Sequence, residues 1–110
     1  EVTLDGSGGR ARVEATRRLL LATGVVDTLP EIEGFAELYG RSAFHCPYCD
    51  GWEHRDQPLT VYGRGAAGKG LALELTAWTR DLVLCTDGPA GLPPDDLDQL
   101  TRNGIGLREE

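Results

Sequence analysis

The sequence has no methionine and few aromatic residues, which make up 6% of its 110 positions. A hydrophobic core therefore has to be built from leucine, valine, isoleucine and alanine. Basic residues are scarce as well, because 11 lysines and arginines stand against 18 aspartates and glutamates and leave a net charge of −7. This balance argues against nucleic-acid binding, which depends on a basic surface and on the release of counterions from phosphates.

Long apolar runs are also absent. The longest predominantly apolar stretch, residues 19–26, is far too short to span a bilayer, so we expect no membrane insertion. With 110 residues, the chain is expected to be one domain at most or a piece of a larger one.

Only three cysteines occur, and an odd, small number is not the pattern of a secreted disulfide scaffold. Two of them form the motif Cys46-Pro47-Tyr48-Cys49. The third, Cys85, lies in an apolar run and is expected to be a small buried strand residue. A close pair in a cysteine-poor chain favours a cytoplasmic protein in which the pair carries out redox or metal chemistry.

The first part of the chain is expected to form a β-hairpin. A run of turn formers, residues 5–9, separates a short strand at 2–4 from a second strand at 11–21. The continuous leucines at 19–21 predict that this second strand ends in a buried core. Residues 25–39 lack the periodicity of a helix or strand and are expected to form an ordered loop, so we place a domain boundary near residue 40.

From residue 58 onward, strands and helices alternate. Leu71, Leu75 and Trp78 share one helical face, and Leu97 and Leu100 share another. The order β-α-β-α-β predicts an α/β fold with a Rossmann-like parallel sheet. The expected strands are 59–62, 82–85 and 105–107; the expected helices are 66–79 and one that Pro93-Pro94 opens and Gly104 closes.

A glycine-rich turn joins the first of these strands to its helix. Gly63, Gly65 and Gly68 fit the pattern G-x-G-x-x-G, which binds the pyrophosphate of a dinucleotide. The first glycine permits the tight turn, the second lets the phosphates approach the backbone, and the third lets the helix pack closely on the strand. The helix N-terminus would offer free N–H groups to the phosphates. The alternative is a turn with a structural role only.

Asp87 lies 19 positions after Gly68, at the end of the next strand, where an acid binds the 2′-hydroxyl of the adenosine ribose. The alternative is that Asp87-Gly88-Pro89 is only a turn. No lysine or arginine lies between residues 81 and 91, so we expect no cation near Asp87 that would hold a 2′-phosphate. These residues favour NADH over NADPH.

The cysteine pair has two chemical interpretations. In the redox interpretation Cys46 and Cys49 close a short disulfide ring, and Asp50 protonates a departing thiolate. In the metal interpretation His45 and His54 complete a zinc site with the two thiols, although a second cysteine knuckle is missing. A non-catalytic zinc-knuckle or nucleotide-binding module therefore remains the alternative to a redox enzyme, and we expect no metal.

Four motifs in order give the chain a resemblance to the low-molecular-weight thioredoxin reductase family of flavoproteins. The resemblance implies that residues 1–40 are the tail of an FAD-binding domain with its crossover linker. Residues 41–110 would be the NAD(P)-binding domain that carries the redox motif. The motifs are Leu-Leu-Ala-Thr-Gly at 20–24, Leu-Pro-x-Ile-x-Gly at 29–34, Cys-x-x-Cys-Asp-Gly at 46–51 and Gly-x-Gly-x-x-Gly at 63–68.

The resemblance also implies roles for individual residues. Cys49 would face the flavin. Cys46 would be the interchange thiol that meets an external disulfide, and Asp50 would be the acid that protonates this thiol. Thr23 and Gly24 would border the FAD. Gly63, Gly65 and Gly68 would hold the pyrophosphate of the nicotinamide cofactor, whose hydride reaches the disulfide through the flavin.

The chain departs from the common family pattern in three places. It lacks a first glycine-rich FAD fingerprint, so it resembles an internal fragment that would be inactive alone. Residues 86–88 replace the usual His-Arg-Arg cluster that binds a 2′-phosphate. His45, Tyr48 and Trp52 are similar to a branch that includes oxidases of small dithiols and reductases with other electron donors.

The implied partner is therefore either a thioredoxin-like protein or a small-molecule dithiol or disulfide. The full-length protein would be a homodimer, because enzymes of this family usually are.

Overall fold

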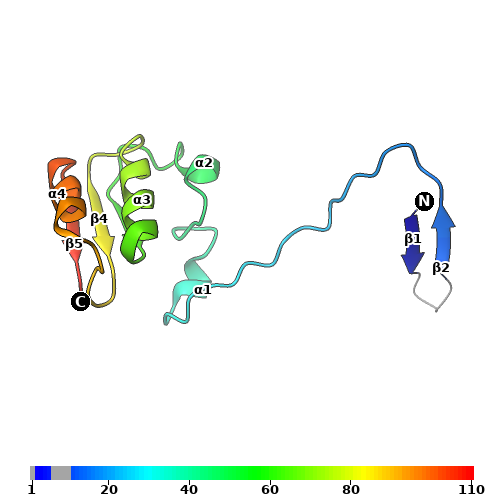
Figure 1. Ribbon diagram of the computed structural model, residues 1–110, viewed down its shortest axis with the longest axis horizontal. Coiled ribbons are helices and arrows are strands. Elements are labelled where there is room, and N and C mark those ends of the chain that lie inside the picture. Colours follow the sequence, from blue (N-terminus) through cyan, green and yellow to red (C-terminus); the bar gives the residue numbers. More distant parts are fainter. Residues whose placement is uncertain (1, 6–10) are drawn as a thin grey trace. The chain divides into compact units, whose positions relative to one another are not determined.

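The computed structural model describes residues 2–5 and 11–110 (Figure 1). The chain divides into two compact units, Glu1–Glu31 and Ile32–Glu110. The predicted α/β class, a parallel sheet preceded by a β-hairpin, is confirmed. None of the helices in the described part of the chain is long and apolar enough to cross a membrane.

The first unit contains the predicted hairpin. Strand β1 (Val2–Asp5) pairs antiparallel with strand β2 (Ala11–Glu14), with Val2 opposite Glu14 and Asp5 opposite Ala11. Apart from Asp5, the turn predicted for residues 5–9 lies outside the described residues.

The second strand of this hairpin is shorter than predicted. It ends at Glu14, because the described part of β1 pairs no further than Val2. Leu19, Leu20 and Leu21 follow without regular structure and are 58%, 87% and 76% exposed. The prediction of a strand that continues to residue 21 and ends in a core was wrong, since leucines are buried only where another surface covers them.

The second unit begins with two short helices. Helix α1 (Phe35–Leu38) lies in the segment expected to be an irregular loop, and that expectation was wrong for these four residues. One helical turn is too short to produce a 3.6-residue pattern in the sequence. Helix α2 (Pro47–Asp50) carries the cysteine pair.

The rest of the second unit is a three-stranded parallel sheet in the order β3-β4-β5, with a helix in each connection. Two predicted strands, 59–62 and 82–85, are confirmed residue for residue, and the third is one residue longer. The elements are β3 (Leu59–Tyr62), α3 (Gly65–Leu75), β4 (Leu82–Cys85), α4 (Pro94–Arg102) and β5 (Ile105–Arg108).

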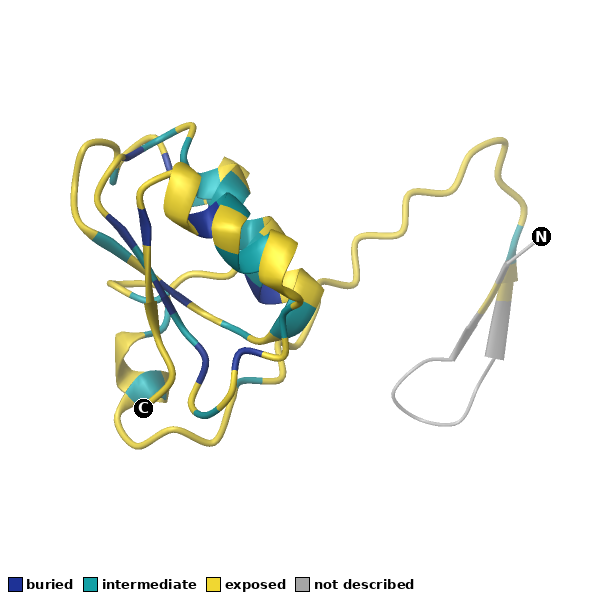
Figure 2. Ribbon diagram, turned by 60° about the vertical axis from the view of Figure 1, so that its left-hand side comes forward, coloured by how far each residue is buried: buried dark blue, intermediate teal, exposed yellow. Residues whose placement is uncertain are grey.

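The core of this unit lies between the sheet and the two helices, and it is built from the aliphatic residues that the composition requires. Figure 2 shows buried positions along the strands of the parallel sheet and on the helices that cover it, whereas the segment before α1 is exposed. Cys85 is half-buried rather than buried. Side chains alternate along a strand, so Cys85 points to the face of the sheet opposite to that of Leu82 and Leu84. The buried cluster consists of Val61, Ala72, Leu82, Leu84, Leu100 and Ile105.

Helix α3 starts one residue earlier and ends four residues earlier than predicted. After Leu75 the chain continues in tight turns, in which the N–H groups of Thr76 and Trp78 donate to the carbonyl oxygens of Leu73 and Leu75. Such i to i−3 bonds are common where a helix ends. Trp78 is therefore placed just beyond the helix, half-buried.

A contact between two glycine backbones joins β3 to α3. A Cβ at Gly68 would lie 2.6 Å from the carbonyl carbon of Gly63 and 2.7 Å from its oxygen. Only a residue without a side chain allows this approach, as the third glycine of the motif requires. Gly70, two residues further along the same helix, has open space at the corresponding position.

We expect Gly68→Ala to destabilise the chain by about 2 kcal/mol or more, because the new methyl group would force helix and strand apart. Gly70→Ala is the matched control and should stabilise by about 1 kcal/mol, since it only improves helix propensity. Denaturant unfolding of both variants measures the difference. Equal effects of the two substitutions would show that the glycine contact does not limit the packing.

The exposed leucines lead to a second prediction. Three adjacent apolar side chains in water favour association, so the chain should self-associate. Replacement of Leu19, Leu20 and Leu21 by serine should reduce the average mass measured by light scattering. A compact monomer with all three leucines present would contradict this expectation.

Candidate functional site

The cysteine pair is held in a single turn of helix. Cys46 precedes the first helical residue, and Pro47 opens α2, where its missing N–H is not needed. The N–H groups of Cys49 and Asp50 donate to the carbonyl oxygen of Cys46 at 3.1 and 3.3 Å. Residues three positions apart lie on the same side of a helical turn, so the two free thiols are neighbours.

The two thiols are electrostatically different. A hydrogen bond with the Cys46 side chain raises the pKa of Cys49, and partial desolvation and the negative charges at Cys46 and Asp50 raise it further. Cys49 is exposed and Cys46 is half-buried. Because the thiolate is the reactive form of cysteine, the raised pKa lowers the reactivity of Cys49 at neutral pH.

Aromatic side chains attach α2 to α3 and to the turn that follows it. The Tyr48 ring meets the Trp78 ring edge to face, with 5.4 Å between centroids. A hydrogen bond to Glu74 raises the pKa of Tyr48. Gly51 is buried beside Trp78, and a Cβ there would lie 2.9 Å from the indole Nε1 and 2.3 Å from the Pro47 oxygen. From the sequence, Trp78 was placed only on a helical face, Gly51 was noted only as the last residue of the Cys-x-x-Cys-Asp-Gly motif, and Glu74 was not identified.

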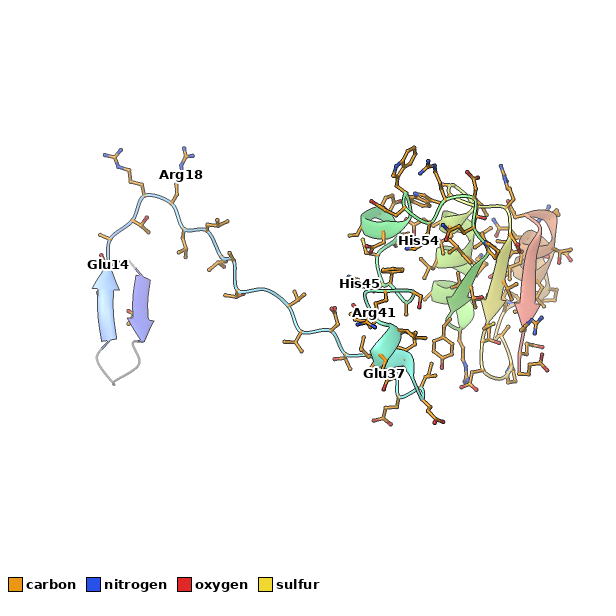
Figure 3. All side chains as sticks on the ribbon, turned by 180° about the vertical axis from the view of Figure 1, so that it is seen from behind. Glu14, Arg18, Glu37, Arg41, His45 and His54 are labelled. Carbon is orange, nitrogen blue, oxygen red and sulfur yellow. The ribbon has the colours of Figure 1, made fainter. Side chains whose placement is uncertain are left out.

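Both histidines near the pair have polar neighbours of their own. The Tyr39 hydroxyl lies 2.5 Å from Nδ1 of His45, and Nδ1 of His54 lies 3.2 Å from Oε1 of Gln57. Figure 3 shows His45 on the segment between α1 and α2, and His54 beyond α2. Within the described residues, no three or more histidine, cysteine, aspartate or glutamate side chains are grouped so that they could hold a metal ion.

The glycine-rich turn has the geometry that a close ligand approach requires. Gly65 has a φ of 56° and no atom within 4 Å of its Cβ position, so this part of the backbone is open. Its N–H donates to the carbonyl oxygen of Ala90 at 2.9 Å. A phosphate at this turn would therefore bind the other amides in the first turn of α3.

Asp87 lies two residues after the end of β4, and a positively charged side chain lies beside it. Its φ is 47°, in the left-handed region, and its Oδ2 is 3.2 Å from Nη2 of Arg64. The expectation that no cation lies near Asp87 was wrong, because it considered only residues 81–91. In a βαβ unit, the turn after the first strand lies beside the end of the next strand.

Thr23 and Gly24 belong to the first unit and are exposed. Gly24 has a φ of 72° and no atom within 4 Å of its Cβ position, so a ligand can approach its backbone closely. Their role beside FAD stays a prediction, as does the division of the chain at residue 40.

The second unit combines a Rossmann-like parallel sheet and its glycine-rich turn with a dithiol on one helical turn. This combination is typical of dithiol oxidoreductases. No protein-family model matches the chain. A probable thioredoxin reductase from Arthroderma benhamiae is 39% identical over 71 residues, which are 64% of this chain and 18% of the relative.

Solved structures agree with this relationship. The structure of HlmI has a TM-score of 0.79 and 40% identity, and the match covers 97% of this chain and 33% of that one. A putative thioredoxin reductase, TrxB from Bacillus anthracis, has a TM-score of 0.71 and 38% identity, with coverages of 81% and 30%. The chain is thus related to thioredoxin reductases and similar oxidoreductases, and the family resemblance is confirmed. It spans less than a fifth of that curated relative and about a third of these two structures.

The thiol hydrogen bond leads to a prediction for Cys49. Cys46→Ala removes the hydrogen-bond partner, so the pKa of Cys49 should fall toward its ordinary value and the thiolate should form at lower pH. Alkylation of Cys49 by iodoacetamide at neutral pH should then be several-fold faster, as measured by mass spectrometry with Cys85 replaced by serine.

Cys46→Ser is the matched control, because its hydroxyl retains an acceptor for the Cys49 thiol and should keep part of the effect. If Cys49 reacts at one rate in the wild type and in both variants, the hydrogen bond does not control its protonation.

Proposed function

We propose that the chain is the dithiol-bearing and nucleotide-binding part of a flavin-dependent, thioredoxin reductase-like oxidoreductase. The observation that carries the proposal is the placement of Cys46 and Cys49 as neighbouring free thiols on one helical turn. The relationship to thioredoxin reductases supports the same chemistry. Residues 1–40 would belong to the FAD-binding domain and its crossover, and residues 41–110 to the NAD(P)-binding domain.

Exchange with a disulfide needs one sulfur that attacks and a second that closes the ring. The Cys46 thiolate attacks one sulfur of the partner disulfide and forms a mixed disulfide, while the other partner sulfur leaves as a thiolate. Asp50, beside Cys49, supplies the proton to the leaving sulfur. Cys49 passes its proton to the Asp50 carboxylate and attacks Cys46, which closes the Cys46–Cys49 disulfide. The second partner sulfur leaves as a thiolate and takes that proton from Asp50. The partner gains two electrons and the cysteine pair loses two.

FAD, when bound, would supply the electrons that reopen this disulfide. Cys49 is the sulfur proposed to face it, and the exposure of Cys49 leaves room for a group outside this unit. Thr23 and Gly24 are proposed to border the flavin, and the open backbone at Gly24 supports a close approach there.

The nicotinamide nucleotide is proposed to bind at the glycine-rich turn. The positive φ of Gly65 and the open space beside it support the approach of a pyrophosphate. Gly63 and Gly68 would support this site by bringing the helix N-terminus close to the strand. Asp87 is the proposed partner of the ribose, at the end of β4.

The proposed partner is a thioredoxin-like protein or a small-molecule dithiol or disulfide. Tyr48 and Trp52, 74% and 66% exposed, lie near the cysteine pair in sequence and offer apolar surface to such a partner. The Arg55 guanidinium covers the Trp52 ring at 4.1 Å. A homodimeric full-length protein in the cytoplasm stays a prediction.

Oxidised glutathione distinguishes the roles of the two sulfurs. In a Cys85→Ser background, Cys49→Ser should accumulate a glutathione adduct on Cys46, because no second thiol remains to resolve it. Cys46→Ser leaves Cys49 with a serine hydroxyl as its hydrogen-bond partner and so keeps part of the rise in the pKa of Cys49, and its adduct on Cys49 should form more slowly at neutral pH. With both cysteines present, the chain should instead form the intrachain disulfide. Mass spectrometry distinguishes these products.

Faster adduct formation on Cys49 than on Cys46 would reverse the assigned roles. If the chain retains one zinc ion per molecule through dialysis, and both thiols react only after chelation, the zinc-knuckle alternative replaces the redox proposal. A disulfide that forms and reopens reversibly would reject that alternative.

A further inference from the structure

The Arg64 side chain links the glycine-rich turn to the loop after β4. Arg64 stands between Gly63 and Gly65 and immediately precedes α3. Its Nε–H donates to the carbonyl oxygen of Thr86, and its Nη2 lies 3.2 Å from Oδ2 of Asp87. These two contacts place the guanidinium at the carboxyl end of β4, beside the position proposed for the adenosine ribose.

The loop that receives Arg64 is itself held in place. Thr86 is fully buried, and its hydroxyl donates to the carbonyl oxygen of Gly88 at 2.5 Å. The N–H of Gly88 donates to the Glu109 carbonyl oxygen at 2.7 Å, and the N–H of Ala90 donates to the Glu109 carboxylate at 2.8 Å. The Thr86 carbonyl therefore gives the guanidinium a fixed anchor.

Asp87 does not act alone at this position. One of its oxygens already accepts a hydrogen bond from Arg64, so a ribose bound here would meet the guanidinium together with the carboxylate. A guanidinium has five N–H donors, of which these contacts engage two, so three remain. The Arg64 side chain is 57% exposed, so a ligand in solution can reach these donors.

We propose that Arg64 is a specificity-determining residue that binds the 2′-phosphate of NADPH and so selects NADPH over NADH. The inference rests on the proposed nucleotide site at the glycine-rich turn. A planar guanidinium pairs with phosphate through two parallel hydrogen bonds, and a phosphate carries more charge than the carboxylate that it would displace. The basic residue thus comes from the turn itself, not from the segment after β4.

The Asp87 carboxylate opposes this binding, and that opposition makes the proposal sharply testable. If Arg64 binds a 2′-phosphate, Asp87→Asn removes a repulsive charge and frees the guanidinium, so the affinity for NADPH should rise. If Asp87 instead binds the ribose 2′-hydroxyl, the same substitution should weaken NADH. The two assignments therefore predict changes in different cofactors and of opposite sign.

The experiment is a calorimetric titration of the chain with NADPH and with NADH. We expect NADPH to bind more tightly, and Arg64→Ala to weaken NADPH by about tenfold while NADH is unchanged. Arg80→Ala is the matched control: it removes the same charge from an exposed position that precedes β4, at the opposite end of the strand from Asp87. It should alter neither affinity, and circular dichroism should show that each variant keeps its fold.

The outcomes separate this inference from the proposed function. If neither nucleotide binds to the wild-type chain, the proposed nucleotide site fails and the role of Arg64 fails with it. If both bind but Arg64→Ala weakens them equally, or if NADH is preferred and Asp87→Asn weakens it, the role of Arg64 is overturned while the nucleotide site stands.

Discussion

The approach of Gly68 to Gly63 is the constraint on which the arrangement of the second unit depends. A Cβ at Gly68 would lie 2.6 Å from the Gly63 carbonyl carbon, so α3 lies closer to β3 than any side chain would permit. From this position the start of α3 directs Arg64 to the end of β4, and the turn after it directs Trp78 to α2. The nucleotide site therefore lies at the start of α3, and α2, which carries the cysteine pair, packs against the turn after the end of α3.

The sequence predicted the elements that are buried against neighbours close to them in the chain. Strands 59–62 and 82–85 were predicted with the bounds that the sheet has, because each apolar run packs against helices that follow within the same unit. The leucines at 19–21 could not be treated in the same way, since apolar character does not reveal which surface covers it. The single turn of α1 could not be predicted either, because periodicity needs more residues than one turn contains.

The same distinction applies to the candidate sites. Cys46 and Cys49 were identified because their chemistry needs only one turn of chain, and the glycines because they need only a strand, a turn and a helix. The partner of Asp87 was missed because Arg64 is 23 positions away and meets it only through the βαβ crossover. One available signal was the arginine between two glycines of the motif. Its long side chain extends from the turn and can reach the neighbouring loop after β4.

The attachment of α2 to α3 has a mechanical consequence. Tyr48 and Trp78 tie the cysteine pair to the helix that begins at the glycine-rich turn, and both belong to the unit Ile32–Glu110. A rotation of this unit as a rigid body would therefore move the dithiol and the glycine-rich turn together. One such motion would change the access of other molecules to both sites at the same time.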